Sequence, residues 1–210
     1  MSLWDFLELK ALVFDFDGVL ADTEPLYWQG WADLLAAYDI PFTWNEYCKF
    51  GRGIKDEQMF ATLPPLASQP ATLSSVMKQL KDRKEIIRQC VAQHSLIGAS
   101  TVCMLQSLKK YKIGLVTTSE REEVEPMLRR AGIYECFQAL VFGGDVQRQK
   151  PHPEPYFRIR QQLGVETGIT FEDSDVGLRS AAEAGLTVIH VAHPRDLPEV
   201  GSRTLRLLSN

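Results

Sequence analysis

The residues best suited to chemistry fall into four short segments that lie far apart along the chain. They offer carboxylates, hydroxyl groups, one cation and further carboxylates, in that order. Such a set suits a metal-assisted phosphate site, because a hard cation such as Mg²⁺ prefers oxygen ligands and accepts a substrate phosphate oxygen. The segments are Asp15-Phe16-Asp17-Gly18, Thr117-Thr118-Ser119, the loop around Lys150, and Glu172-Asp173.

The spacing of the acidic residues indicates which of them face one cavity. Asp15 and Asp17 are two residues apart, so on an extended chain their side chains point the same way. Glu172 and Asp173 are adjacent and cannot both do so on a regular strand. We therefore expect Asp15 and Asp17 to face one cavity, Asp173 to be the direct metal ligand there, and Glu172 to have a weaker, water-mediated role. Mg²⁺ is the expected cofactor.

Short apolar runs precede most of these segments and predict buried strands. Helical patterns lie between the runs, and Arg129-Arg130 before Gly132 and Leu163-Gly164 are typical of helix ends. Alternating strands and helices predict an α/β fold with a doubly wound, Rossmann-like parallel sheet, and ligands bind such sheets beyond the carboxyl ends of the strands. The predicted strands span 11–14, 113–117, 139–142, 169–171 and 187–191.

About ninety residues separate the first two predicted strands, far more than a helix crossover needs. The stretch shows no strand-like alternation, so we predict an inserted all-helical cap domain at 22–94, between core segments 1–21 and 95–210. Thr23 is expected to cap its first helix, and Thr43-x-x-Glu46 forms a capping box. Further helices are predicted at 56–62 and 73–91, with a loop at 64–70 between them.

Composition excludes several classes of protein. The 210 residues are 45% hydrophobic and 24% charged, with a formal net charge of −4. No run is long and apolar enough for a membrane span, and the balance of charge gives no footprint for nucleic acid. The start does not read as a secretory signal, so we expect a cytoplasmic location. We also expect a monomer. Four widely spaced cysteines predict neither disulfides nor a zinc site, and we expect buried thiols at Cys48, Cys90, Cys103 and Cys136.

The four segments resemble, in order, the four motifs of the haloacid dehalogenase superfamily. The first reads Asp15-Phe16-Asp17-Gly18-Val19-Leu20, and the third reads Lys150-Pro151-His152-Pro153. The helical insertion is similar to the cap of the phosphoglycolate phosphatase and β-phosphoglucomutase branch. The resemblance implies a Mg²⁺-dependent phosphatase that acts on a small phosphorylated metabolite through an aspartyl-phosphate intermediate.

The same resemblance implies a role for each site residue. Asp15 is the expected nucleophile, and Asp17 the general acid and base as well as a metal ligand through its carbonyl. Lys150 is the expected charge clamp and Asp173 the metal carboxylate. The phosphate donors are expected to be Thr117, Thr118 and Ser119, the last two through backbone N–H groups at the start of the following helix.

Two alternatives to a phosphatase stay open, a sugar-phosphate phosphomutase and a non-catalytic binding protein on the same fold. Mutases of the branch carry a histidine where this chain has Tyr27, and a cap arginine where it has Ile54. A silent protein should have lost Asp15 or Lys150. Arg52 and Lys55 lie where related caps carry a specificity loop, and either substrate contact or a solvated surface fits them.

Overall fold

The computed structural model describes residues 11–208. Within this range the chain forms two compact units. One contains the described parts of Met1–Asp22 and Ser95–Asn210, and the other is Thr23–His94. The first unit carries the sheet, and we call it the core; the second is the helical unit.

Five parallel strands form the sheet of the core, in the order β3-β2-β1-β4-β5. The first strand of the chain therefore lies at the centre, with β2 and β4 as its neighbours. This arrangement confirms the predicted doubly wound α/β fold. The strands are β1 (Ala11–Phe14), β2 (Lys112–Val116), β3 (Ala139–Val141), β4 (Ile169–Glu172) and β5 (Thr187–His190).

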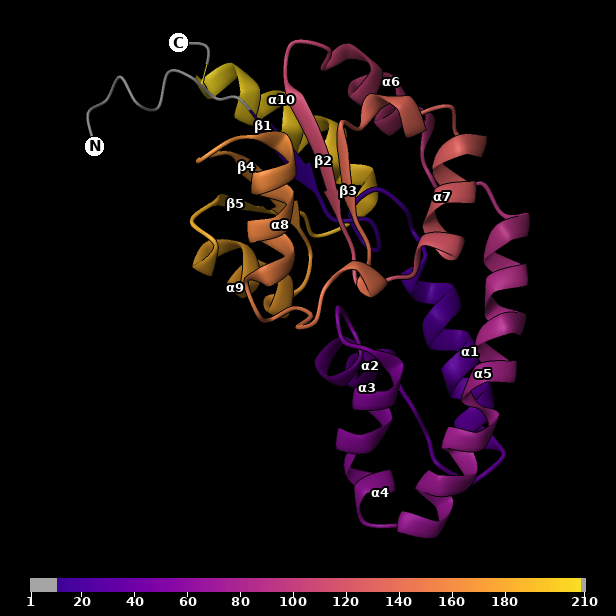
Figure 1. Cartoon of the computed structure of the whole chain (residues 1–210). Coiled ribbons are helices and arrows are strands. Elements are labelled where there is room, and N and C mark those ends of the chain that lie inside the picture. Colours follow the sequence, from indigo (N-terminus) through magenta and orange to yellow (C-terminus); the bar gives the residue numbers. More distant parts are fainter. Residues whose placement is uncertain (1–10, 209–210) are drawn as a thin grey trace. The chain divides into compact units, whose positions relative to one another are not determined.

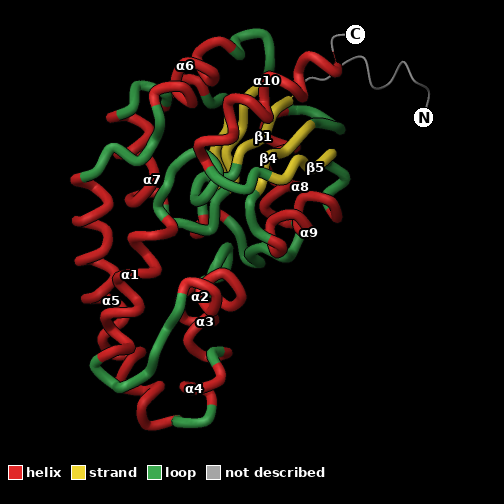
Figure 2. Tube along the Cα trace, turned by 180° about the vertical axis from the view of Figure 1, so that it is seen from behind, coloured by secondary structure: helices red, strands yellow, loops and turns green. Residues whose placement is uncertain are grey.

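Helices cover both faces of this sheet (Figures 1 and 2). Contacts place α8 against β2 and β3, and α9 against β4 and β5. On the opposite face α10 packs against α6. The helices are α6 (Ala99–Ser107), α7 (Arg121–Arg130), α8 (Glu154–Leu163), α9 (Asp175–Glu183) and α10 (Leu197–Leu208), with short 3₁₀ turns η2 (Tyr134–Cys136), η3 (Gly143–Asp145) and η4 (Pro194–Asp196).

Close packing beneath α8 holds the central strands in place. Val13 and Val116 belong to an apolar cluster that also contains Ile159 of α8. Gly114 of β2 permits this approach, since a Cβ there would lie 2.7 Å from a side-chain carbon of Ile159. α8 ends where predicted, at Gly164 with φ of 61°, a left-handed conformation that glycine adopts at little cost.

The helical unit contains no strand among its residues, all of which the structure describes. The capping box of Thr43 and Glu46 is confirmed at the start of α2. Two predictions were wrong: the side chain of Thr23 makes no capping hydrogen bond, and Pro64, expected in a loop, begins α4. The helices are α1 (Glu24–Ala36), α2 (Trp44–Phe50), α3 (Asp56–Thr62), α4 (Pro64–Ala67) and α5 (Pro70–Gln93).

Aromatic side chains form much of the interior of the helical unit. Trp31 is fully buried, and its ring meets that of Phe60 edge to face at 5.4 Å. Trp28 is half-buried, donates to the carbonyl of Phe42 at 2.9 Å and lies 5.7 Å from the ring of Trp44. These contacts fit a structural role for the cap tryptophans.

The cysteines are free, as expected, but the prediction of buried thiols was wrong, since none of the four is fully buried. Cys103 is exposed, because it lies on the outer side of α6, and the other three are partly accessible. None of the helices in the described range is long and apolar enough to cross a membrane.

Candidate active site

The first acidic segment lies directly beyond the central strand. β1 ends at Phe14, and the amide of Asp15 still donates to the carbonyl of Phe171 on β4, at 3.0 Å. The chain then turns sharply, because the amides of Leu20 and Ala21 both donate to the carbonyl of Phe16. This turn leaves Asp15 only 5% exposed at the carboxyl end of the sheet, whereas Asp17 is partly accessible.

Lys150 joins the first and last acidic segments. Its Nζ lies 2.9 Å from Oδ1 of Asp15 and also contacts Oε1 of Glu172. A third hydrogen bond, of 3.2 Å, goes to the carbonyl of Val116 at the end of β2. All three charged side chains are almost completely buried, so their attraction is screened far less than that of a surface pair. Lys150 thus links the ends of three neighbouring strands.

Burial and charge shift the pKa values of this cluster in opposite ways. Burial, and then the negative charge of Glu172, raise the pKa of Asp15 well above its ordinary value, although Lys150 opposes the shift. Burial alone would lower the pKa of Lys150, but Asp15 and Glu172 outweigh it and raise that pKa well above its ordinary value. Lys150 therefore stays positively charged, and any further positive charge nearby would stabilise the ionised carboxylate of Asp15.

Glu172 and Asp173 both reach the cluster, contrary to the expectation from strand alternation. β4 ends at Glu172, so Asp173 already belongs to the following loop and the alternation no longer applies. Both oxygens of Glu172 accept hydrogen bonds: Oε1 from Lys150 and Tyr156, and Oε2 from the amide of Asp173 and the hydroxyl of Ser174. These hydrogen bonds fix the orientation of the Glu172 carboxylate, which in turn positions Lys150.

Three carboxylates come close enough together to share a cation. Asp15, Glu172 and Asp173 each offer an oxygen, and these oxygens lie within 4.8 Å of one another. The donors are all hard oxygens, and one lysine ammonium does not balance three carboxylates that are buried together. This donor set fits a divalent cation such as Mg²⁺.

The second segment brings hydroxyl groups to Asp17. Ser119 Oγ donates to Oδ2 of Asp17 at 2.7 Å, and the Thr117 hydroxyl lies 3.4 Å from the same oxygen. The structure places Thr118 and Ser119 in the loop before α7, whose N-cap is Glu120, and not at the helix start as expected. The Ser119 amide donates instead to Thr117 Oγ1, at 3.0 Å.

The loop after β3 holds residues 117–119 in place through hydrogen bonds. The amide of Gly143 donates to the carbonyl of Ser119 at 2.9 Å, and the side-chain amide of Gln149 donates to the carbonyl of Gly143. A side chain at Gly143 would collide with the backbone carbonyl of Thr118. The hydroxyl loop is thereby tied to the segment that ends at Lys150.

Sequence reasoning missed two residues that shape the site. Tyr156, fully buried on α8, donates its hydroxyl to Glu172, and Lys150 lies 5.3 Å from the centre of its ring. Glu154 accepts the amides of Gln147 and Arg148 and so fixes the loop before Lys150; the amide of Gln147 is the main cause that lowers its pKa. Tyr156 could have been suspected, because it lies on the inner face of a helix that begins just after the lysine.

Seven of the predicted site residues therefore meet at the carboxyl edge of the sheet, and Thr118 lies in the same loop as two of them. Arg52 and Lys55 belong to the helical unit, where Arg52 is half-buried and Lys55 is the exposed N-cap residue of α3. Substrate contact by these two residues stays a prediction. His152 has a structural role in the loop before α8, since its Nδ1 accepts a hydrogen bond from the amide of Glu154.

Comparison with known proteins places this geometry in a family. A family model described as haloacid dehalogenase-like hydrolase matches residues 12–191. A phosphorylated carbohydrates phosphatase of Thermotoga maritima is 28% identical over 185 residues, which are 87% of this chain and 84% of that protein. A β-phosphoglucomutase of Bacillus subtilis is 26% identical over 194 residues, 87% of this chain and 83% of that protein.

A solved structure shares the fold at lower identity. The crystal structure of a β-phosphoglucomutase from Clostridium difficile superposes with a TM-score of 0.77 at 18% identity, over 96% of this chain and 100% of that chain. The likeness extends over both the sheet and the helical insertion, as this coverage requires.

Proposed function

The chain belongs to the haloacid dehalogenase-like hydrolases, and we propose that it is a Mg²⁺-dependent phosphatase of a small phosphorylated metabolite. A sugar phosphate or a phosphoglycolate-like compound is the proposed substrate, in keeping with the relative named for phosphorylated carbohydrates. One observation carries the proposal: Lys150 holds Asp15 and Glu172 together beside Asp173, at the carboxyl ends of adjacent strands. A site that neutralises an anion at Asp15 accounts for this arrangement.

The proposed magnesium ligands are the carboxylates of Asp15 and Asp173 and the backbone carbonyl of Asp17. Glu172 is a weaker candidate, because its oxygens already accept hydrogen bonds from the protein. When bound, the ion supplies positive charge that offsets the repulsion between the Asp15 carboxylate and a phosphate dianion.

In the first proposed step a carboxylate oxygen of Asp15 attacks phosphorus. The bond from phosphorus to the ester oxygen breaks as the new bond forms, and the protonated Asp17 gives its proton to the departing oxygen. Lys150, already 2.9 Å from Asp15, offsets the charge that the transferring group carries. The hydroxyl of Thr117 and the amide of Thr118 are the proposed donors to the phosphoryl oxygens, while the Ser119 hydroxyl stays on Asp17.

In the second proposed step Asp17, now a carboxylate, takes a proton from water as the water oxygen attacks phosphorus. The bond to Asp15 breaks, inorganic phosphate leaves, and both aspartates return to their starting states. The hydrogen bond from Ser119 to Asp17 supports this role, because it holds the carboxylate in one orientation near the hydroxyl loop.

A sugar-phosphate mutase is the second candidate, favoured by the similarity to a protein named β-phosphoglucomutase. Both activities share the phosphoaspartate and differ in the acceptor of the phosphoryl group, which is water or a second sugar hydroxyl. Tyr27 and Ile54 stand where the resemblance implies a histidine and an arginine in mutases, which favours water.

A substrate panel tests the proposal. Sugar phosphates, phosphoglycolate, nucleotides and phosphoamino acids are incubated with the protein and Mg²⁺, and both inorganic phosphate and isomerised sugar phosphate are measured. The phosphatase proposal predicts stoichiometric release of phosphate from at least one small phosphomonoester. Isomerisation of glucose 1-phosphate without net phosphate release would replace it with the mutase.

A further inference from the structure

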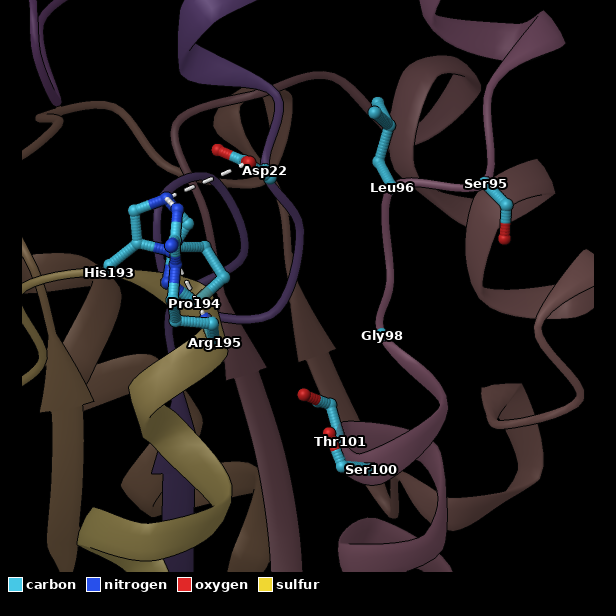
Figure 3. A pocket seen from close by; sticks show the side chains of 9 residues that line it. All are labelled: Asp22, Ser95, Leu96, Gly98, Ser100, Thr101, His193, Pro194 and Arg195. Carbon is cyan, nitrogen blue, oxygen red and sulfur yellow. Dashed lines mark hydrogen bonds and ion pairs between the residues drawn. The ribbon is translucent and has the colours of Figure 1, made fainter.

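A pocket in the core uses none of the residues proposed for catalysis. Its volume is about 350 Å³, within the range of about 300–1,000 Å³ typical of small-molecule sites. The start of α6 and the turn η4 form its walls (Figure 3). The residues used below are Asp22, Gly98, Ser100, Thr101, His193 and Arg195, all of which line it.

The N-terminus of α6 presents unused hydrogen-bond donors to this pocket. The first hydrogen bond of the helix runs from the amide of Val102 to the carbonyl of Gly98, at 3.1 Å. The preceding amides of Ser100 and Thr101 therefore have no acceptor within the helix. Gly98, the N-cap residue, has no side chain to accept from them. The helix dipole adds partial positive charge at the same end.

Two hydroxyl groups converge on this helix start. An ideal Cβ on Gly98 would lie 3.9 Å from both Ser100 Oγ and Thr101 Oγ1, so the two oxygens share one side of the turn. Thr101 is only 2% exposed and lines the pocket, yet its hydroxyl has no hydrogen-bond partner among residues 11–208. Unlike the hydroxyl of Thr170, which is fully enclosed, the Thr101 hydroxyl opens into the pocket, where a bound molecule or water can satisfy it.

The opposite wall supplies a full positive charge. Nε and Nη2 of Arg195 lie 3.1 and 3.0 Å from the two ring nitrogens of His193. In the described part of the chain its Nη1 has no partner, so it is available to a ligand. Asp22 is the one carboxylate among the lining residues, and it pairs with His193 at 3.7 Å. The remaining donors favour an anion.

We propose that this pocket binds a phosphate group, either inorganic phosphate or the phosphate of a small molecule. The phosphate oxygens would accept hydrogen bonds from the amides and hydroxyls of Ser100 and Thr101 and from the guanidinium of Arg195. Helix N-termini are favourable sites for such anions. The volume left beside one phosphate group leaves room for a small organic substituent.

The test is an NMR titration of the ¹⁵N-labelled full chain with inorganic phosphate in the presence of Mg²⁺. The amides of Ser100 and Thr101 report this pocket, whereas those of Asp17 and Thr118 report the proposed catalytic site, so each site can fail alone. We expect saturable shifts at Ser100 and Thr101. A parallel titration with methylphosphonate distinguishes the two sources, because tighter binding than phosphate indicates an organic phosphate ligand.

Matched variants make the test specific. Thr101→Val should weaken binding at the α6 amides by about tenfold or more, the effect of losing a hydrogen bond to a charged group. Thr170→Val is the control, since Thr170 in β4 has an unpartnered hydroxyl that is fully buried and does not line this pocket. Arg195→Gln alters an exposed side chain and should weaken binding similarly, with Arg203→Gln on α10 as its control.

The proposal fails if the amides of Ser100 and Thr101 show no saturable shift. It also fails if Thr101→Val and Arg195→Gln bind phosphate as tightly as their controls do.

Discussion

Asp17 has two proposed roles that can be tested separately, acid–base catalysis through its carboxylate and metal binding through its backbone carbonyl. Its carboxylate accepts from Ser119 at 2.7 Å, and it is expected to bind metal only through its backbone carbonyl. Asp17→Asn should therefore keep Mg²⁺ while losing both acid and base. General acid catalysis contributes about 10²–10⁴-fold, and less when the leaving group departs without a proton. The variant should slow phosphorylation by alkyl phosphates far more than by p-nitrophenyl phosphate.

Single-turnover phosphorylation of wild type and Asp17→Asn by both substrates, at saturating Mg²⁺, measures this difference. A burst of nitrophenol is expected from the variant, because hydrolysis of the intermediate still lacks its base. If the phosphorylation rate fell by the same factor with both substrates, Asp17 would not be the general acid, and another residue or water would have that role. A Mg²⁺ titration is the control for metal binding.

Tyr156 is predicted to position Lys150 through Glu172. Tyr156→Phe keeps the ring packed but removes the hydroxyl that Glu172 accepts. Loss of a buried hydrogen bond to a charged group should lower the free energy of unfolding by about 1.5–3 kcal/mol. We expect kcat to fall about tenfold with KM nearly unchanged, since the phosphate ligands remain.

Denaturant titration and steady-state kinetics check both effects. Tyr134→Phe is the matched control, because its hydroxyl has no hydrogen bond among the residues that the structure describes, and it should alter neither quantity. A Tyr156→Phe variant with unchanged kcat would show that Tyr156 only fills space.

At the level of elements, the start of α9 sets the position of the last acidic segment. Ser174 is the N-cap residue and accepts the amide of Gly177 at 3.2 Å, which brings this first turn against Glu172. A methyl group on Gly177 would overlap with the Glu172 carboxylate. Gly177→Ala should therefore displace Glu172 from Lys150, lower kcat by at least about tenfold, and cost about 1–3 kcal/mol from overpacking.

The control for this change is Gly201→Ala in α10, where the new Cβ meets only the sulfur of the Met104 side chain. That variant should keep its activity, because a flexible side chain can move aside. Equal activity of the two alanine variants would show that the contact between α9 and Glu172 does not govern the site.

The elements differ in how well the sequence predicted them. Buried parallel strands are near-continuous apolar runs, so β1 could be recognised over its four residues, and β4 over 169–171, one residue short of its end at Glu172. Pro64 was read as a loop residue, yet proline is compatible with the first turn of a helix, where α4 uses it. Thr23 failed as a cap because its backbone is already in the helical region, with φ of −86° and ψ of −29°.

The candidate site was predictable where chemistry alone selects residues. Asp15, Lys150 and Asp173 were identified by residue type at strand ends, and they meet in the core. The hydrogen bonds of Glu172 could not be predicted, because they depend on Tyr156 reaching it from α8. Such contacts arise from packing between elements distant in sequence, which local patterns do not encode.

For the molecule as a whole, metal binding should couple to pH and to stability. Burial and neighbouring carboxylates raise the pKa of Asp15, so the metal-free fold binds the Asp15 proton more tightly than the unfolded chain does. Stability of the metal-free protein should therefore decrease as pH rises from the ordinary pKa of an aspartate to the raised one. Mg²⁺ displaces that proton, and its affinity should increase over the same pH window.

Thermal unfolding at several pH values, with EDTA or with Mg²⁺, measures this coupling. Mg²⁺ at a hundredfold excess over its Kd should stabilise the protein by about 2.7 kcal/mol. Asp173→Asn is the control, since it should reduce the Mg²⁺-dependent increase in Tm. If Tm were the same with EDTA and with Mg²⁺ at every pH, the carboxylate cluster would not be a metal site.

The central claim is that Asp15 carries the phosphoryl group, and rapid chemical quench tests it most directly. The enzyme is mixed with p-nitrophenyl phosphate and Mg²⁺, quenched in acid within milliseconds, digested and analysed by mass spectrometry. We predict one added phosphoryl group on the peptide that contains Asp15, removed by hydroxylamine as an acyl phosphate is, and absent from Asp15→Asn. Phosphate release without any phosphorylated peptide, or a modification on another residue, would contradict the account.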